Sequence, residues 1–303
     1  MTILAIDVGN SRAKIGIWHN VNPTGQAADM LTAVPLTPEV DLPTEIRRWL
    51  KLASSPKVDQ AIVAGSNPNP VDDLMASWLG KEIPVIQIRS YQQIPLKMDV
   101  ENPETVGIDR LLTAIAVRSR QTIPTSVIVV DAGTATTVNL TTADGTFRGG
   151  AILPGMRMSA HALHDYTAVL PLIDADSLVG TESQNHAAAI DPSAPTPNEI
   201  LRSAHDGSSV IGNAGQNTTL KMPGRHTTSA IQNGIFWGHL GSIKELIAQL
   251  TANQKSSGTD ISDLAIAITG GGGRQLARLI PNAVYEDSLA LIGLSTLARS
   301  TNH

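Results

Sequence analysis

The sequence predicts an α/β protein made of two related domains, and three observations support this prediction. Apolar stretches with the length of buried strands alternate with amphipathic helices along most of the chain. The pattern begins again near residue 126. Two strands run into an Asp-x-Gly turn, at Asp7 and Asp131, and 131 − 7 = 124 residues separate the turns, which is a domain length. We therefore expect domains at 1–120 and 121–303.

The first domain is expected to contain four strands and three helices. The strands are short apolar runs, and the second is interpreted as the hairpin partner of the first. The helices show apolar residues at helical spacing, with glycine or proline near the ends of two of them. The expected strands are 3–9, 14–18, 60–65 and 83–88, and the expected helices are 44–53, 71–80 and 109–120.

The second domain is expected to repeat this alternation around a long polar segment. Its first strand, 126–130, enters the second Asp-x-Gly turn, and two further strands flank the hairpin signal Asp144-Gly145. The remaining expected elements are a helix at 154–166 opened by Pro154, a helix at 227–250, a strand from 263 and a helix at 288–300. Residues 174–222 are rich in Ser, Asn, Pro, Thr and Gly, so most of them are expected to form a surface excursion.

Composition excludes several classes of protein. The net charge is −5 and there is no basic run, so no nucleic-acid partner is expected. The chain has no cysteine, which rules out disulfides and thiolate chemistry. Asp7 interrupts the apolar start, and no window supplies about 20 apolar residues, so neither a signal peptide nor a membrane partner is expected. A cytoplasmic protein is the expectation.

The two Asp-x-Gly turns suit a phosphate site. Glycine lets a phosphate approach backbone N–H groups without a Cβ atom in the way, and an aspartate at a strand end can hold a hydrated cation such as Mg²⁺. Ser11, Thr134 and Thr137 add hydroxyl groups, and Lys14 can reach a phosphate as a point charge. The alternative is an ordinary turn. Two copies a domain apart, each after an apolar strand, favour the functional interpretation.

The glycine run 270–273 follows a predicted strand and precedes a helix start. Its bare backbone can lie against an adenine or a ribose, and the alternative is a flexible turn. The chain has no GxxxxGK[ST] motif and no GxGxxG motif after a strand, so a P-loop and a dinucleotide fold are not expected. The eight histidines show no paired metal-binding spacing.

Asp109 and Arg110 stand at the entry to the helix predicted for 109–120, behind Gly107. A carboxylate next to a guanidinium suits a general base beside an anion clamp. An ordinary helix-start aspartate with a surface arginine is the alternative, and composition alone favours it.

Several stretches, in this order, resemble the type III pantothenate kinase family, and the likeness runs over nearly the whole chain. They are DVGNSRAK (7–14), NPETVGIDR (102–110), DAGTATTVNL (131–140), GGAILPG (149–155), TAVLP (167–171) and TGGGG (269–273). The resemblance implies two duplicated RNase H-like domains of the actin-like ATPase superfamily with an ATP cleft between them. It implies ATP-dependent phosphorylation of pantothenate, the first step of coenzyme A biosynthesis. It also implies Mg²⁺, a monovalent cation (K⁺ or NH₄⁺), and a homodimer with the active site near the interface.

The resemblance also assigns roles to residues of this chain. Asp109 would be the general base, Asp131 would hold the monovalent cation, and Asp7 could hold Mg²⁺. The residues implied for pantothenate binding are Val100, Gly107, Ile108, Asp109, Arg110 and Thr227. Those implied for ATP binding are Asp7, Val8, Gly9, Asn10, Ser11, Arg12, Ala13, Lys14 and Thr134.

Three features depart from the family pattern. Ser11 replaces a frequent threonine and keeps the hydroxyl group. Val100 stands where the family often has a tyrosine that lines the pantothenate pocket, which puts the shape of that pocket in doubt. Residues 174–222 look like an insertion.

Two other functions stay open at this stage. One is another small-molecule kinase of the superfamily, acting on a sugar or on acetate. The Gly-x-Asp-Arg motif at 107–110 and the short first domain argue against it. The other is an ATP-binding regulatory protein that has lost catalysis, against which the presence of Asp7, Asp109 and Asp131 argues.

Overall fold

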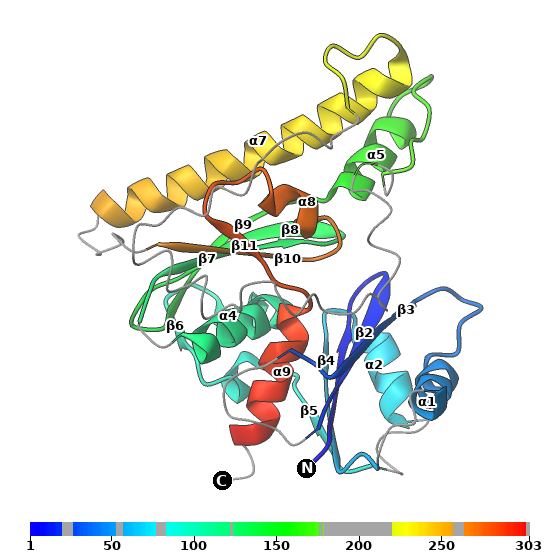
Figure 1. Ribbon diagram of the computed structural model, residues 1–303, viewed down its shortest axis with the longest axis vertical. Coiled ribbons are helices and arrows are strands. Elements are labelled where there is room, and N and C mark those ends of the chain that lie inside the picture. Colours follow the sequence, from blue (N-terminus) through cyan, green and yellow to red (C-terminus); the bar gives the residue numbers. More distant parts are fainter. Residues whose placement is uncertain are drawn as a thin grey trace. The chain divides into compact units, whose positions relative to one another are not determined.

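Two sheets with the same strand order form the framework of the computed structural model, which describes residues 1–19, 27–52, 57–76, 83–121, 124–175, 178, 220–256 and 264–300 (Figure 1). The first sheet has the order β3-β2-β1-β4-β5. β1 pairs antiparallel with β2 and parallel with β4. Its strands are β1 (Ile3–Val8), β2 (Arg12–Trp18), β3 (Met30–Pro35), β4 (Gln60–Gly65) and β5 (Val85–Gln87).

The second sheet repeats this arrangement within the order β11-β10-β7-β8-β9-β6. β7 pairs antiparallel with β8 and parallel with β10, as β1 does with β2 and β4. The strands are β6 (Lys97–Met98), β7 (Val127–Ala132), β8 (Ala135–Thr141), β9 (Thr146–Pro154), β10 (Ala265–Thr269) and β11 (Ala283–Tyr285). The duplicated α/β fold predicted from the sequence is therefore confirmed.

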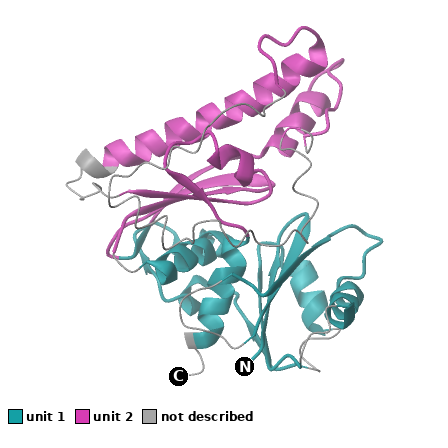
Figure 2. Cartoon of the chain, in the orientation of Figure 1, with its two compact units in different colours: residues 1–121, 145–147, 288–303 teal, residues 122–144, 148–287 magenta. Residues whose placement is uncertain are grey.

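Contacts divide the chain into two compact units (Figure 2). Unit 1 contains residues 1–121, 145–147 and 288–303, and unit 2 contains 122–144 and 148–287. The predicted domains follow the duplicated sequence pattern, whereas these units follow contacts. The C-terminal helix accordingly groups with unit 1.

In unit 1, helices cover both faces of the first sheet (Figure 1). α1 (Leu42–Leu52) and α2 (Pro68–Leu74) share a core with Leu4, Ile6 and Val8 of β1. Successive side chains of a strand point to opposite faces, so Asp7 lies on the other face. That face is covered by α4 (Ile108–Arg120) and α9 (Leu289–Ser300). Asp7 and the helix that carries Asp109 in its first turn therefore lie on the same side of one sheet.

In unit 2, α7 (Thr227–Ser256) and α8 (Gly273–Ala277) pack on one face of the second sheet. Ile128, Val130 and Ala132 of β7 contribute to that core. By the same alternation, Asp131 lies on the opposite face of β7. α5 (Met156–Asp165) packs against α7 through a second cluster that includes Ile235 and Phe236. None of the helices within the described ranges is both long and apolar enough to cross a bilayer.

The structure departs from the predicted elements in several places. β3, β6 and β11 were not expected, because two of them are only two or three residues long and the third carries no strong β pattern. Pro154 ends β9 and does not open a helix, since α5 begins at Met156 after Gly155. α2 begins at Pro68, and its predicted end at Gly80 lies outside the described residues. Two 3₁₀ turns, η2 (Tyr91–Gln93) and η3 (Pro103–Thr105), precede α4.

The predicted surface excursion at 174–222 lies largely outside the described residues. Its described ends do not fit that expectation. Ala175 and Leu178 are buried in the cluster formed with α5 and α7, and Leu220 packs against it. The apolar ends of the segment therefore belong to the core of unit 2.

Candidate active site

The first Asp-x-Gly turn joins β1 to β2 in unit 1. The Gly9 N–H group donates a hydrogen bond to the Arg12 carbonyl at 3.0 Å, which closes the turn. Asp7 is only 8% exposed, whereas Asn10 and Ser11 are exposed at the tip. The turn thus combines a buried carboxylate with accessible backbone and hydroxyl groups, as a phosphate site requires.

Two of the residues implied for ATP binding, Val8 and Ala13, have side chains that are fully buried in the core of unit 1. They can offer only backbone groups to a nucleotide. Lys14 is half-buried and lies directly opposite Asp7 in the β1–β2 pair. Directly opposite residues share a face of the sheet, so this cation and this carboxylate are neighbours on the side covered by α4 and α9.

The second Asp-x-Gly turn joins β7 to β8 in unit 2. Asp131 is half-buried, and Gly133 and Thr134 are exposed at the tip. The start of α5 packs on this tip, because the Gly155 N–H group donates to the Thr134 carbonyl at 3.1 Å. A Cβ atom at residue 155 would lie 2.4 Å from the Gly133 carbonyl oxygen. The GGAILPG stretch is therefore packed against the second Asp-x-Gly turn.

The glycine run is in contact with Asp131. In the parallel β7–β10 pair Thr269 lies opposite Asp131, and the Gly272 N–H group donates to the Ala132 carbonyl at 3.2 Å. Gly270 has φ +90°, and a Cβ atom there would lie 2.6 Å from Asp131 Oδ1. Gly271 is exposed, and a Cβ atom added there would have no neighbouring atom within 4 Å. The run therefore makes room for the aspartate as well as offering bare backbone.

Tyr285, at the end of β11, belongs to this group and was not predicted from the sequence. Its hydroxyl donates to the Gly270 carbonyl at 3.5 Å, and the Arg274 guanidinium lies 4.7 Å from its ring centroid. Burial, together with the charges of Asp287 and Asp131, raises the pKa of Tyr285, so the phenol stays a neutral donor. A lone tyrosine in a short unpredicted strand gave no signal that could have found it.

Asp109 and Arg110 occupy the first turn of α4, after Gly107 at the N-cap. Both side chains are half-buried. Asp109 Oδ1 accepts a hydrogen bond from the Arg110 N–H group at 2.9 Å. A Cβ atom on Gly107 would lie 2.5 Å from the same oxygen, so only glycine leaves the carboxylate in this position. Ile108 is the first residue of the helix. Asp109 and Arg110 thus both stand in the first turn of α4, and the Asp109 carboxylate is bound by the backbone N–H group of Arg110.

The Arg110 guanidinium lies 5.6 Å from the centroid of the Phe147 ring. Burial lowers the pKa of Arg110, while the negative charge of Asp109 acts in the opposite direction. An arginine pKa lies so far above neutrality that the side chain keeps its charge. Arg110 therefore presents a partly desolvated cation, which binds a carboxylate more strongly than an exposed cation does.

The other two residues implied for pantothenate binding lie in different units. Val100, which is half-buried, lies two residues after the end of β6 in unit 1. Thr227 is exposed at the N-terminus of α7 in unit 2. The cleft predicted between the domains would have to bring these two residues together, and it stays a prediction.

The groups around Asp131 suit a monovalent cation. Asp131 Oδ1 and the Ala132 carbonyl oxygen both lie close to Gly270, because a Cβ atom there would be 2.6 Å from each of them, so a carboxylate and a carbonyl oxygen are near one another. Oxygen ligands of this kind bind hard cations. Asp7 supplies one buried carboxylate in unit 1. In the described part of the chain no three histidine or acidic side chains gather as a metal cluster. A Mg²⁺ ion at Asp7 would therefore need phosphate and water as its other ligands.

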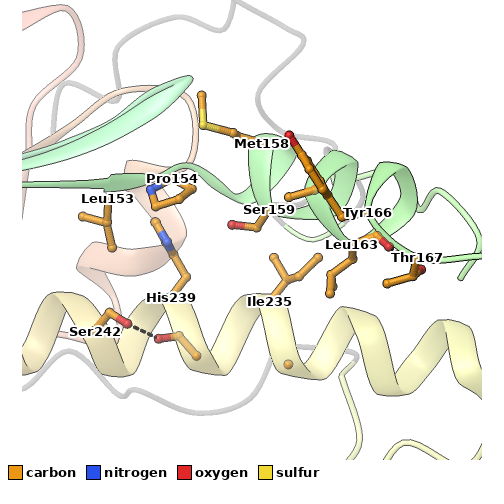
Figure 3. Close-up of a pocket in the computed structure, with 13 residues that line it drawn as sticks. Leu153, Pro154, Met158, Ser159, Leu163, Tyr166, Thr167, Ile235, His239 and Ser242 are labelled. Atoms are coloured by element: carbon orange, nitrogen blue, oxygen red, sulfur yellow. Dashed lines mark hydrogen bonds between the residues drawn. The ribbon is translucent and has the colours of Figure 1, made fainter.

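An apolar pocket of about 740 Å³ lies between α5 and α7 in unit 2 (Figure 3). Leu163 and Ile235 line it, and His239 stands at one end below Pro154. The buried His239 ring makes a hydrogen bond between Nε2 and Thr136 Oγ1 at 3.1 Å. Burial lowers the pKa of His239. No motif in the sequence marks this pocket, because most of the residues that line it are ordinary positions on the faces of α5 and α7.

Comparison with known proteins identifies the family. The sequence profile described as type III pantothenate kinase matches residues 3–190, more than half of the chain. The type III pantothenate kinase of Chlorobaculum parvum is 28% identical over 304 residues, covering 98% of this chain and 94% of that protein. That of Caulobacter vibrioides is 27% identical over 274 residues, covering 88% and 87%.

A solved structure agrees at the level of the fold. A protein from Campylobacter jejuni, named as a Baf family transcriptional activator, superposes with a TM-score of 0.53 at 17% identity, covering 99% of this chain and 98% of that one. This likeness shows a shared fold alone. From the profile match, which extends over the first turn, the α4 start and the second turn, the chain belongs to the type III pantothenate kinase family.

Proposed function

We propose that this protein transfers the γ-phosphoryl group of ATP to the primary alcohol of pantothenate, giving 4′-phosphopantothenate and ADP, the first step of coenzyme A biosynthesis. The observation that supports this most is the Asp109–Arg110 pair, held by Gly107 at the start of α4 in a chain of this family. A carboxylate held in this position suits a general base, a group that phosphoryl transfer to an alcohol uses.

Asp109 acts as the general base. Oδ1 is engaged by the Arg110 N–H group, which orients the carboxylate. The carboxylate accepts the proton of the pantothenate alcohol as the alcohol oxygen forms its bond to the γ-phosphorus. The bond between that phosphorus and the β–γ bridging oxygen breaks, and ADP leaves with the electron pair. Arg110 pairs with the carboxylate of pantothenate and so fixes how far the alcohol lies from ATP.

The two Asp-x-Gly turns hold the phosphates of ATP. Gly9 and Gly133 let phosphate oxygens approach backbone N–H groups, while Ser11, Lys14 and Thr134 supply side-chain donors. A metal ion bound with ATP offsets phosphate charge. Asp7 is the proposed ligand for Mg²⁺, and Asp131 for K⁺ or NH₄⁺. The remaining implied contacts, from Asn10 and Arg12 to ATP and from Val100, Ile108 and Thr227 to pantothenate, are part of the same proposal.

The protein is proposed to form a homodimer through the exposed apolar surface of unit 2. Several large side chains on and after α5 are exposed; they are Met158, Leu163, Tyr166, Val169 and Leu172, with Tyr166 at 89% and Val169 at 85%. Apolar patches of this kind mark interaction surfaces. Met158, Leu163 and Tyr166 line the apolar pocket between α5 and α7, so the same apolar surface on a second copy is a suitable partner. We propose a cytoplasmic location, with no nucleic-acid or membrane partner.

A coupled ADP-release assay tests the function. Purified protein with Mg²⁺ and K⁺ should release ADP with pantothenate and not with sugars or acetate, and mass spectrometry should detect phosphopantothenate. Release with a sugar or acetate alone would favour another kinase of the superfamily. Nucleotide binding without any ADP release would favour a regulatory protein.

A further inference from the structure

We infer that Phe147 is a positioning residue for the substrate carboxylate: its ring holds the Arg110 guanidinium in place. This inference rests on the proposed role of Arg110 in binding pantothenate. Phe147 is fully buried, and the Arg110 guanidinium lies 5.6 Å from its ring centroid. This distance is within the range of about 6 Å over which the negative face of an aromatic ring attracts a cation.

The segment that carries Phe147 lies along α4 at two points. Near the other end of the helix, the Arg118 guanidinium covers Gly145, where a Cβ atom would lie 2.1 Å from Nη1. Gly145 has φ +83°, as the tight turn after Asp144 requires. Arg118, Gly145 and Phe147 all belong to unit 1. The start of β9 therefore packs against the helix that carries Asp109 and Arg110. This packing fixes the position of the Phe147 ring relative to Arg110.

The backbone of Phe147 reaches the second substrate segment. Met98 lies opposite Phe147 in the β6–β9 pair, and the Asp99 N–H group donates to the Phe147 carbonyl at 2.9 Å. Val100, implied to line the pantothenate pocket, follows directly. One residue thus contacts Arg110 with its ring and fixes the neighbour of Val100 with its carbonyl.

Because the Arg110 side chain is partly buried, its contact with the Phe147 ring is expected to affect substrate binding. Burial lowers the pKa of Arg110, which reflects the loss of water around the guanidinium. A long flexible side chain without a platform would sample several rotamers, and ordering it would oppose substrate binding. The aromatic face attracts the cation without using the N–H donors in the guanidinium plane. The expected effect is on the KM for pantothenate.

Stepwise fluorination of the ring tests this inference with little change of shape. Phe147 is replaced site-specifically by 4-fluoro-, 3,5-difluoro- and 3,4,5-trifluorophenylalanine, which progressively remove negative charge from the ring face. The KM for pantothenate should rise at each step, by roughly three- to thirty-fold in total, the range that corresponds to a cation–aromatic contact. The KM for ATP and the kcat should stay near those of the parent protein.

The chain offers a matched control, because it has only two phenylalanines. Phe236 is also fully buried, and it packs edge-on against Trp237 in unit 2. The same series at Phe236 should leave the KM for pantothenate unchanged. A flat series at Phe147, or an equal rise in the KM values for both substrates, would overturn the inference.

Arg110→Ala separates this inference from the proposed function. If Arg110→Ala raises the KM for pantothenate while the fluorinated series at Phe147 is flat, Arg110 binds the substrate and the ring does not position it. If Arg110→Ala leaves that KM unchanged, the proposed role of Arg110 is wrong, and the inference about Phe147 is wrong with it.

Discussion

Gly270 stands directly against the carboxylate of Asp131, since a Cβ atom at residue 270 would lie 2.6 Å from Asp131 Oδ1. Gly270→Ala should displace the carboxylate and strain the backbone, because φ +90° is unfavourable for alanine. We expect a loss of about 1–3 kcal/mol in the free energy of unfolding and a higher K⁺ concentration for half-maximal activation. Thermal unfolding and a K⁺ titration of the rate measure the two effects.

Gly271→Ala is the matched control, because nothing lies within 4 Å of that position. It should keep the stability and the K⁺ response of the parent protein. If Gly270→Ala behaved like Gly271→Ala, the close contact with Asp131 would have no role in cation binding.

Asp131 itself is predicted to determine the response to K⁺. A carboxylate facing a polyanionic nucleotide is repelled by it, and a bound cation converts that repulsion into attraction. Activity should fall strongly when Na⁺ replaces K⁺, and Asp131→Asn should reduce the difference between the two salts. Steady-state rates in matched chloride salts decide this. Equal rates in K⁺ and Na⁺ for the parent protein would remove Asp131 from this role.

Tyr166→Glu should convert a dimer to a monomer. The side chain is 89% exposed, so the charge is tolerated in a single copy but not in an apolar interface. Leu52→Glu is the control, because Leu52 is 75% exposed on α1 of unit 1, whereas the residues of the proposed dimer surface belong to unit 2. Sedimentation velocity compares the two variants. If the Tyr166→Glu protein sedimented with the mass of a dimer, as the parent protein is expected to do, the interface would have to lie elsewhere.

His239 should make stability depend on pH. Its pKa is lowered by burial in the folded protein, so below the ordinary value of about 6.5 the unfolded chain binds a proton more readily. The contribution of His239 to stability is therefore fully present above about pH 6.5 and is lost as the pH decreases. No other histidine or acidic residue lines the adjoining pocket within the described part of the chain. His239→Gln should lessen the decrease in melting temperature between pH 7.5 and 5.5, and an identical decrease would contradict this prediction.

Most of the fold could be predicted because its core strands are unusually apolar. β1 and β7 are buried along nearly their whole length, and each ends in the same turn, so the duplication is visible in the sequence. β6 and β11 could not be predicted, because strands of two or three residues carry no periodicity. Pro154 was misinterpreted because proline is favoured both at a helix start and at the end of an edge strand.

The residues of the candidate site also divide into those that could be predicted from the sequence and those that could not. Asp7, Asp131 and Asp109 follow local signals, namely a strand end or a helix start, so their positions could be predicted. Phe147 and Tyr285 could not, because their roles depend on contacts with Arg110 and Gly270 that are distant in the sequence. The prediction of Val8 and Ala13 as ATP contacts came from a continuous motif, whereas alternation along the strand turns their side chains into the core.

Steady-state kinetics of Asp109→Asn test the central claim most directly. Asparagine keeps an oxygen that can accept the Arg110 N–H hydrogen bond, and loss of one negative charge from the first turn costs the helix only about 0.3–1 kcal/mol, so the start of α4 should be preserved. It cannot accept the proton of the alcohol. We predict that kcat falls by about 10²–10⁴ while ATP still binds, the usual cost of losing a general base. A kcat within a few-fold of the parent enzyme would contradict the account and leave Asp109 as a structural residue of the helix start.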